Sequence, residues 1–339
     1  MVKFKMFIVI EVLTILNTKH EGKHLMKLST TKIKPIALLL LILTLTIISL
    51  SLLTEANAET TIITMTPQEG IVGTTLQLTA NVSTTNGQYK IMFDENEVLS
   101  GNATGNNVTE SFSIPHAPEG AHNVTVIDVT SAENDTGTFT ILTSYTFKPI
   151  TPESPAQIQE GGNVTISINM TGGKPNYLYP NIAVQTPSGN QTYEPLRNIT
   201  TTATGEFYDN LTYPTDFSSG ANTDFTGEYK ILFNATVENQ FFIGLTNSSK
   251  YHRGDLVNIK AVDYYPPNDN VTLAIKFADA IIDYMGWNAT DGILDLNWPI
   301  PLNATIGTYT LVITPVPKSK QEANDTQTFD VPGFKTEIF

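Results

Sequence analysis

The sequence predicts an all-β chain of tandem antiparallel β-sandwich domains, preceded by one apolar N-terminal helix. After Ala58 it consists of short alternating runs rich in Val, Ile, Thr, Tyr and Phe, punctuated by Gly, Pro and Asn. Such runs are typical of strands and turns at sandwich spacing. Three short motifs then recur in one order, which indicates an internal repeat. Before Ala58 the apolar residues are continuous rather than alternating.

The N-terminal helix is predicted over Ile36–Leu53, an apolar run interrupted only by Thr and Ser. Lysines 27, 32 and 34 precede it, and the small-x-small site Ala56-Asn57-Ala58 follows. This order is typical of an export signal cleaved after Ala58. The run is also nearly long enough to span a bilayer, so an uncleaved anchor with its lysines inside is the alternative. Either way, the later residues lie outside the cell.

The residues before that signal do not fit a folded domain. Met26 begins a complete signal by itself, so we expect translation to start there. Residues 1–25 are then a mis-assigned or disordered extension, and residues 26–58 are the signal peptide or signal anchor. The remaining length suffices for two or three domains.

Charge and cysteine content exclude several classes of function. The chain has 19 basic and 33 acidic residues, of which 7 and 3 lie in residues 1–58. The remainder has a net charge of −18 and repels phosphate backbones, so nucleic-acid binding is not expected. With no cysteine, disulfides, thiolate metal sites and cysteine nucleophiles are excluded. Each domain must be held together by its hydrophobic core.

The first repeated motif is a glycine followed by apolar residues at alternate positions. Its copies are Gly73 with Leu76, Leu78 and Ala80; Gly161 with Val164, Ile166 and Ile168; and Gly254 with Val257, Ile259 and Ala261. A period of two places these side chains on one face of a strand. In the second copy the other face holds Asn163, Thr165, Ser167 and Asn169. Each copy therefore predicts a half-buried strand.

The second motif is a strand ending at proline, followed by a loop and a glycine-x-aromatic sequence that begins another strand. The copies are Pro115 with Gly120-Ala-His122, Pro214 with Gly227-Glu-Tyr229, and Pro299 with Gly307-Thr-Tyr309. Proline cannot donate to a ladder and marks a strand end or edge. Tyr229 and Tyr309 are candidates for corner tyrosines that bond back to the backbone, and His122 takes that position in the first copy.

The third motif is an asparagine-rich turn into a strand led by phenylalanine: Asn134 to Phe139, Asn239 to Phe241, and Asn324 to Phe329. Together the motifs predict immunoglobulin-like sandwiches, each about 100 residues long or slightly shorter. We place them at 60–143, 144–238 and 239–332. Residues 333–339 alternate again and are expected to begin a further, truncated strand or domain.

The third copy resembles the macroglobulin-type sandwich. The resemblance lies in Ser249-Lys-Tyr-His-Arg-Gly-Asp-Leu-Val257, Gly307-Thr-Tyr309 and Phe329-Asp-Val-Pro-Gly-Phe334. The second copy shares it in part, and the first is similar to generic immunoglobulin-like repeats of archaeal or bacterial surface proteins. Thioester macroglobulins trap proteases through a cysteine–glutamine bond, which a chain without cysteine cannot form. The resemblance therefore implies a scaffold of spacer modules, not that activity.

Glycosylation sequons are unusually frequent. They occupy 16 of the 26 asparagines after Ala58, whereas random placement would give about five. A strand-rich surface explains part of the excess, and N-glycosylation of an exported chain explains the rest. This density without cysteine favours an archaeal envelope protein. The sequon asparagines are Asn81, Asn102, Asn107, Asn123, Asn134, Asn163, Asn169, Asn190, Asn198, Asn210, Asn234, Asn247, Asn270, Asn288, Asn303 and Asn324.

No motif of catalysis or cofactor binding is present, and we assign no catalytic, cofactor-binding or metal-binding residue. His116 and His122 flank one loop, but no third metal ligand is evident at a suitable spacing. Calcium would need converging oxygens. The loose groups available are Asp94, Glu95 and Glu97; Asp263 and Asp269; and Asp291 and Asp295, and solvated turns explain them as well.

Aromatic residues of the third copy provide the remaining candidates. Trp287 and Trp298 could stack on sugars, but core packing is the better interpretation for Trp298, which lies in the strand before Pro299. Phe277, Ile281, Ile282 and Met285 recur at helical spacing and favour a short helix between strands.

The function that these observations favour is a non-catalytic, exported cell-surface structural or adhesion protein, an acidic array of glycosylated β-sandwich spacers. Other surface proteins or polysaccharides are the expected partners, and the membrane is contacted only through the N-terminal segment if that segment is uncleaved. The alternative is an extracellular carbohydrate- or protein-binding module that acts through the loops of the second and third copies, including Trp287 and Tyr264. An extracellular hydrolase is the third hypothesis, and it lacks a recognisable catalytic set.

Overall fold

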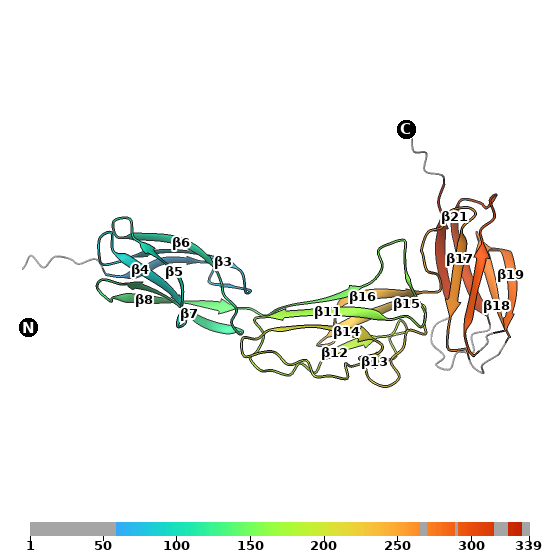
Figure 1. The fold of residues 1–339 in the computed structure, drawn as a ribbon, viewed down its shortest axis with the longest axis horizontal. Coiled ribbons are helices and arrows are strands. Elements are labelled where there is room, and N and C mark those ends of the chain that lie inside the picture. The colour runs from blue at the N-terminus through green and yellow to red at the C-terminus, as the bar shows by residue number, and fades with distance from the viewer. Residues whose placement is uncertain (1–58, 265–269, 289–290, 315–324, 334–339) are drawn as a thin grey trace, which may run out of the picture. The chain divides into compact units, whose positions relative to one another are not determined.

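The structure is a computed structural model that describes residues 59–264, 270–288, 291–314 and 325–333 (Figure 1). Within these ranges every regular element is a strand, and the strands pair into three antiparallel β-sandwiches. The all-β prediction is thus confirmed for these residues. The predicted helix at Ile36–Leu53, the extension at 1–25 and residues 334–339 lie outside them.

The first sandwich packs a three-stranded sheet against a five-stranded sheet. The smaller sheet has the order β1 (Thr61–Thr66), β3 (Thr75–Asn81), β6 (Asn107–Ser113). The larger has the order β2 (Glu69–Gly70), β8 (Asn134–Ile141), β7 (Gly120–Asp128), β4 (Gln88–Phe93), β5 (Asn96–Asn102). β2 joins β8 in parallel, and the other pairs are antiparallel.

The second sandwich repeats this arrangement. Its smaller sheet has the order β14 (Phe207–Tyr213), β11 (Val164–Thr171), β9 (Ser144–Ile150). The larger has the order β10 (Ile158–Gln159), β16 (Thr236–Gly244), β15 (Gly227–Phe233), β12 (Ile182–Gln185), β13 (Thr192–Tyr193). The parallel pair recurs between β10 and β16.

The third sandwich differs from the others in its smaller sheet. That sheet has two strands, β17 (Leu256–Ala261) and β20 (Leu294–Pro299). The larger sheet has the order β19 (Ala280–Asn288), β18 (Asn270–Phe277), β21 (Gly307–Thr314), β22 (Thr326–Val331). The strand that would precede β17 is reduced to isolated bridges in the described part of the chain, Thr246 to Ile259 and Lys250 to Asp330.

The first motif forms the predicted half-buried strands β3, β11 and β17. All nine of its apolar side chains are buried to 1% exposure or less, and the second copy's alternate residues Asn163 and Asn169 are exposed. Burial of a Val, Leu or Ile contributes about 1.5–3 kcal/mol, so this alternation fixes which face of each strand meets the core. The glycines of the motif have positive φ, from 73° to 89°, which residues with a Cβ rarely adopt.

The second motif forms an equivalent corner in every sandwich. The Tyr309 hydroxyl donates to the Thr305 carbonyl at 2.7 Å, and the Tyr229 hydroxyl accepts from the Phe225 N–H at 3.3 Å. In the first sandwich His122 makes the matching contact, from Nε2 to the Pro118 carbonyl oxygen at 2.8 Å. The predicted corner tyrosines are therefore confirmed, and histidine serves the same purpose in the first copy because its ring nitrogen reaches the carbonyl four residues back.

The third motif aligns with these corners across the sheet. Phe139, Phe241 and Phe329 are the strand partners of His122, Tyr229 and Tyr309. The pairing also corrects one boundary. Residues 239–244 belong to β16, which pairs with β15, so the division between 238 and 239 cuts through a strand of the second sandwich. Its cause is that the loose second copy of this motif lies in the middle of β16.

The predicted helix around Phe277–Met285 is wrong. These residues form the hairpin of β18 and β19, whose two-residue turn, Ala278-Asp279, has φ values of 47° and 64°. Such positive values match the twist of the flanking strands. Phe277 and Met285 both pack on the core, but from two different strands, and this produces the helix-like spacing. Ile281 is 57% exposed, so no single helical face was buried.

Candidate functional site

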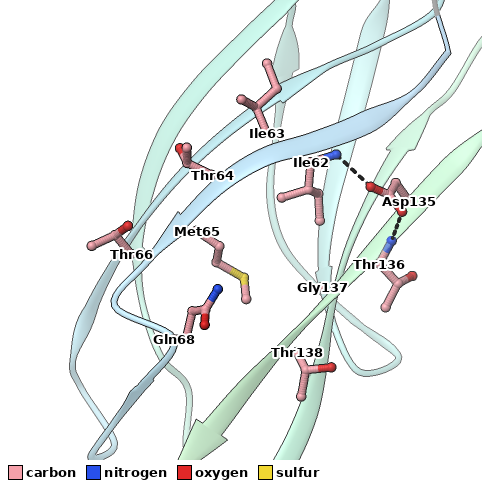
Figure 2. A pocket seen from close by; sticks show the side chains of 10 residues that line it. All are labelled: Ile62, Ile63, Thr64, Met65, Thr66, Gln68, Asp135, Thr136, Gly137 and Thr138. Atoms are coloured by element: carbon pink, nitrogen blue, oxygen red, sulfur yellow. Dashed lines mark hydrogen bonds between the residues drawn. The ribbon is translucent and has the colours of Figure 1, made fainter.

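A groove of the first sandwich lies between β1 and β8 (Figure 2). It has a volume of about 550 Å³. A β-bulge between Ile62 and Thr64 interrupts the ladder of β1, and Ile63 is 53% exposed at this bulge. Gly137 lies beneath Met65, and a Cβ added to that glycine would lie 3.2 Å from the Met65 Cε. The groove is therefore a product of local strand geometry.

The chemistry available in this groove is limited to hydrogen bonding. Asp135 is the ionisable group among its described lining residues, and Thr64, Thr66, Thr136 and Thr138 supply hydroxyls. The Asp135 carboxylate accepts the Ile62 N–H at 2.7 Å and the Thr136 N–H at 2.9 Å, as Figure 2 shows. It thereby satisfies a backbone donor that the bulge frees from the ladder. Glycoside hydrolysis needs two facing carboxylates, and this groove offers one.

The acidic group at Asp94, Glu95 and Glu97 is divided among separate partners. Asp94 accepts the Asn123 N–H at 2.9 Å and contacts His122 Nδ1 at 2.8 Å. Glu97 pairs with Lys90 at 2.7 Å, and the hydrogen bond from Lys90 lowers the pKa of Glu97. The oxygens do not converge as a calcium site requires.

The acidic residues of the third sandwich also remain apart. Asp295 accepts from the Asn258 amide at 3.3 Å. Asp263 lies in the segment after β17, Asp291 lies in a turn, and Asp269 is outside the described residues. Across 59–264, 270–288, 291–314 and 325–333, no group of three or more His, Asp or Glu side chains is placed to hold a metal ion. Calcium binding stays an untested hypothesis.

The two loop histidines have different partners and do not form a pair. His122 is buried at its corner and stacks on Phe93, with 5.2 Å between ring centroids. His116 is exposed, and its Nδ1 contacts the Glu206 carboxylate of the second sandwich. The interpretation of His122 as a corner histidine is confirmed.

The aromatic candidates of the third sandwich are core residues where the structure describes them. Trp298 is 3% exposed, and its Nε1–H donates to Asp283 at 2.8 Å. Tyr264 is 2% exposed and donates to Asp325 at 2.5 Å. Burial and the neighbouring Asp325 raise the pKa of Tyr264, so its hydroxyl stays protonated. Trp287 lies in β19, and its side chain is outside the described part.

Sequence reasoning missed three fully buried carboxylates, Asp128, Glu160 and Asp325. Burial alone would raise the pKa of Asp128, but backbone N–H groups of Thr84 and Ser131 hold that pKa well below its usual range. The position of Asp128 at a strand end, before Val129-Thr-Ser131, is a local signal for this kind of turn. Glu160 has no such signal, because its partner Val262 lies 102 residues later.

The sequon asparagines are strongly exposed. Of the fifteen that the structure describes, fourteen are exposed and Asn81 is half-buried. Of the nine described asparagines outside sequons, six are exposed. Asn81 lies at the end of β3 between two partner strands, and its Oδ1 is buried without a hydrogen-bond partner. Asn324 is outside the described residues.

In the ranges that the structure describes, no helix could span a membrane. No protein-family model matches the chain, and no curated protein matches it. Solved structures do match. A tetra-tandem repeat from the extending region of a large adhesion protein is 16% identical, covers 80% of this chain and 74% of its own, and has a TM-score of 0.30.

Two further structures represent the scaffold classes that the sequence resembles. Alpha-2-macroglobulin from Salmonella is 12% identical and covers 83% of this chain, with a TM-score of 0.22; this chain spans 20% of its length. An ICAM-5 ectodomain fragment is 12% identical, covers 81% of this chain and 76% of its own, and has a TM-score of 0.25. The resemblance of the chain to macroglobulin-type and immunoglobulin-like scaffolds rests on its sequence motifs, because TM-scores of 0.22 to 0.30 carry no argument. The archaeal origin stays a prediction.

Proposed function

We propose that the chain is an exported, non-catalytic structural or adhesion protein of the cell surface, built as an acidic array of glycosylated sandwich spacers. The observation that carries this proposal is the exposure of the sequons. Fourteen of fifteen described sequon asparagines are exposed, although several lie within strands, where alternate residues face the core. Attachment of a glycan requires an exposed side chain, so the exposure of these fourteen asparagines supports the proposal.

The composition of the surface supports the same function. A net charge of −18 after Ala58 keeps such an array soluble through self-repulsion. Each sandwich has its own apolar core, so a spacer can be built by adding units. Glycans and charge would cover the outer faces, and partners on the same or another surface would be engaged beyond the array.

The alternative, a carbohydrate- or protein-binding module, named Trp287 and Tyr264 as candidate residues, and the structure excludes Tyr264. Tyr264 is buried and bonded to Asp325, so it cannot present its ring to a polysaccharide. Within the third sandwich this alternative therefore rests on Trp287, which lies in β19.

The test is the intact mass of the protein isolated from its native host, combined with cell fractionation. We expect recovery from the envelope or medium, a start at Glu59 if the signal is cleaved after Ala58, and added mass in glycan-sized steps. Uncleaved protein in the membrane fraction would favour the anchor and leave the proposal intact. Unmodified protein in the cytosol would overturn it.

A further inference from the structure

We propose that a glycan attached to Asn234 folds back into an aromatic pocket of the second sandwich, so that its first sugar becomes part of the domain. This inference rests on the proposed glycosylation. It goes further by assigning a binding site to one glycan and a ligand class, the pyranose ring of an N-linked sugar, to the pocket.

The attachment point is the tip of a tight hairpin. Asn234 and Ala235 form the turn between β15 and β16, with φ values of 49° and 63°. The Asn234 Oδ1 accepts from the Asn181 amide at 3.0 Å, and the Asn234 N–H donates to the Asn181 carbonyl at 2.9 Å. These bonds hold the side chain of Asn234 at one place beside the 174–181 loop, while the residue remains exposed.

Four aromatic residues line the pocket next to this turn, and Glu119 of the first sandwich and Thr143 also contribute to its wall. It has a volume of about 410 Å³, within the ordinary range for small-molecule sites. Tyr145, Tyr177, Tyr179 and Phe233 line it together with Asn234 itself. The rings form one connected cluster, with centroid distances of 4.6 Å for Tyr145–Phe233, 5.8 Å for Tyr179–Phe233 and 4.9 Å for Tyr177–Tyr179.

This lining suits a sugar ring. One face of a pyranose carries C–H groups, and covering it with an aromatic ring removes apolar surface from water. Lys174 and Asn181, which also line the pocket, can bond to hydroxyls. Tyr177 remains 41% exposed in the bare protein, which leaves ring surface for a ligand to cover.

The glycan needs only a weak affinity for the pocket, because attachment at the pocket wall makes the contact intramolecular and the effective concentration high. Asn234 also lines a second cavity, of about 580 Å³, whose lining includes Glu194 and Ser218 but no aromatic ring. The aromatic pocket is therefore the one of the two cavities in which a sugar ring can remove more apolar surface from water.

The experiment is a double-mutant cycle on the full chain isolated from its native host. Thr236→Val removes the sequon while keeping Asn234 and its turn, and Thr236→Ser, which keeps the sequon, is its control. Tyr177→Ala removes one pocket wall, while the N–H of residue 177 still donates to the Thr201 hydroxyl and its carbonyl still accepts from the Thr201 N–H. Tyr208→Ala is the control for the loss of an exposed tyrosine elsewhere in the same sandwich.

Occupancy at Asn234 is first measured by glycopeptide mass spectrometry. Thr236→Val should then lower the melting temperature of the second sandwich by roughly 4 °C in the wild-type background, the shift of about 1 kcal/mol for a domain of this size. In the Tyr177→Ala background it should change nothing, and in the Tyr208→Ala background it should act as in the wild type.

Equal effects of Thr236→Val in all backgrounds would overturn the inference. So would an unoccupied Asn234 among occupied sequons, and neither result would touch the proposed function. Absence of glycan from every sequon would overturn both.

Discussion

The third sandwich differs from the first two in the smaller sheet. In each sandwich one strand of this sheet begins after the glycine of the first motif, and the difference lies in the strand that pairs with it. β1 pairs with β3 from Thr61 to Thr66, and β9 pairs with β11 from Ser144 to Ile150. β17 has instead a single bridge on that side in the described chain, between Ile259 and Thr246. An open edge leaves backbone donors and acceptors without partners, so the third sandwich needs another way to satisfy them.

Side chains of the second sandwich supply it. The Gln159 amide donates to the carbonyls of Leu245 and Asn258 at 3.0 and 3.2 Å. The Glu160 carboxylate accepts the Val262 N–H at 3.0 Å and the Thr226 hydroxyl at 3.0 Å. Both residues lie at or just after β10. Two side chains of the second sandwich thus provide hydrogen-bond partners for backbone groups at the edge of the third.

The sandwiches therefore differ in how far their stability depends on side chains of a neighbour. Asp128, the buried carboxylate of the first sandwich, bonds to Ser83, Thr84, Thr130 and Ser131, all within its own sandwich. Glu160 bonds across the junction. We therefore expect the third sandwich to lose stability when Glu160 of the second is altered, and a change at Asp128 to act within the first sandwich.

The largest effect is expected for Glu160→Ala. It leaves the Val262 N–H and the Thr226 hydroxyl without their acceptor in a buried place, at a cost of roughly 2–4 kcal/mol. Both tryptophans, Trp287 and Trp298, lie in strands of the third sandwich, so tryptophan fluorescence in a urea titration follows that sandwich. Its midpoint should fall although the mutation lies in the second.

Glu153→Ala is the matched control, because Glu153 is an exposed glutamate shortly before β10. A fluorescence midpoint that moves no further for Glu160→Ala than for Glu153→Ala would contradict the coupling of the two sandwiches.

Asp128→Asn should produce a large effect confined to the first sandwich. The loss of charged acceptors for backbone donors costs roughly 2–3 kcal/mol, visible as an early phase in circular dichroism. Tryptophan fluorescence should not move. Glu133→Gln, in the same turn and exposed, serves as control. A shift of the tryptophan midpoint would show that the first sandwich is coupled as well.

The loss of stability at low pH provides a second test of the role of Asp128 in the first sandwich. The pKa of Asp128 is lowered in the folded state, so its stabilisation is present above the unfolded pKa of about 3.9 and is lost as pH falls below it. The stability of the first sandwich, followed by circular dichroism, should therefore fall with acid in the wild type and much less in Asp128→Asn. Equal acid sensitivity of the two proteins would mean that other carboxylates cause the loss of stability at low pH.

The smallest effect is expected for Tyr309→Phe, which removes the corner bond to the Thr305 carbonyl. One neutral hydrogen bond contributes about 1 kcal/mol, and tryptophan fluorescence measures it because the corner lies in the third sandwich. Tyr284→Phe, an exposed tyrosine of the same sandwich, should change nothing. Identical midpoints for the two variants would mean that the corner bond adds no stability.

What could be predicted from sequence was what local spacing determines. The alternation after Gly73, Gly161 and Gly254 identified buried strands, because period two leaves each side chain only one face. The corner at Tyr309 followed from a glycine-x-tyrosine motif. The hairpin at Ala278-Asp279 was missed because two strands folded onto one core imitate a helical period.

The junction could not be predicted, for a different reason. In the run Gln-Ile-Gln-Glu-Gly-Gly, Glu160 has the local features of a solvated turn. Its burial depends on Val262, which only tertiary folding brings near. The sequons were visible in the sequence, but their exposure depends on strand register, which sets Asn81 apart from the others.

A glycopeptide map of the protein from its native host tests the central claim most directly. We expect glycans on the exposed sequon asparagines of all three sandwiches and an unmodified Asn81, whose side chain is half-buried between strands. A protein isolated without glycan on any of these asparagines would contradict the central claim.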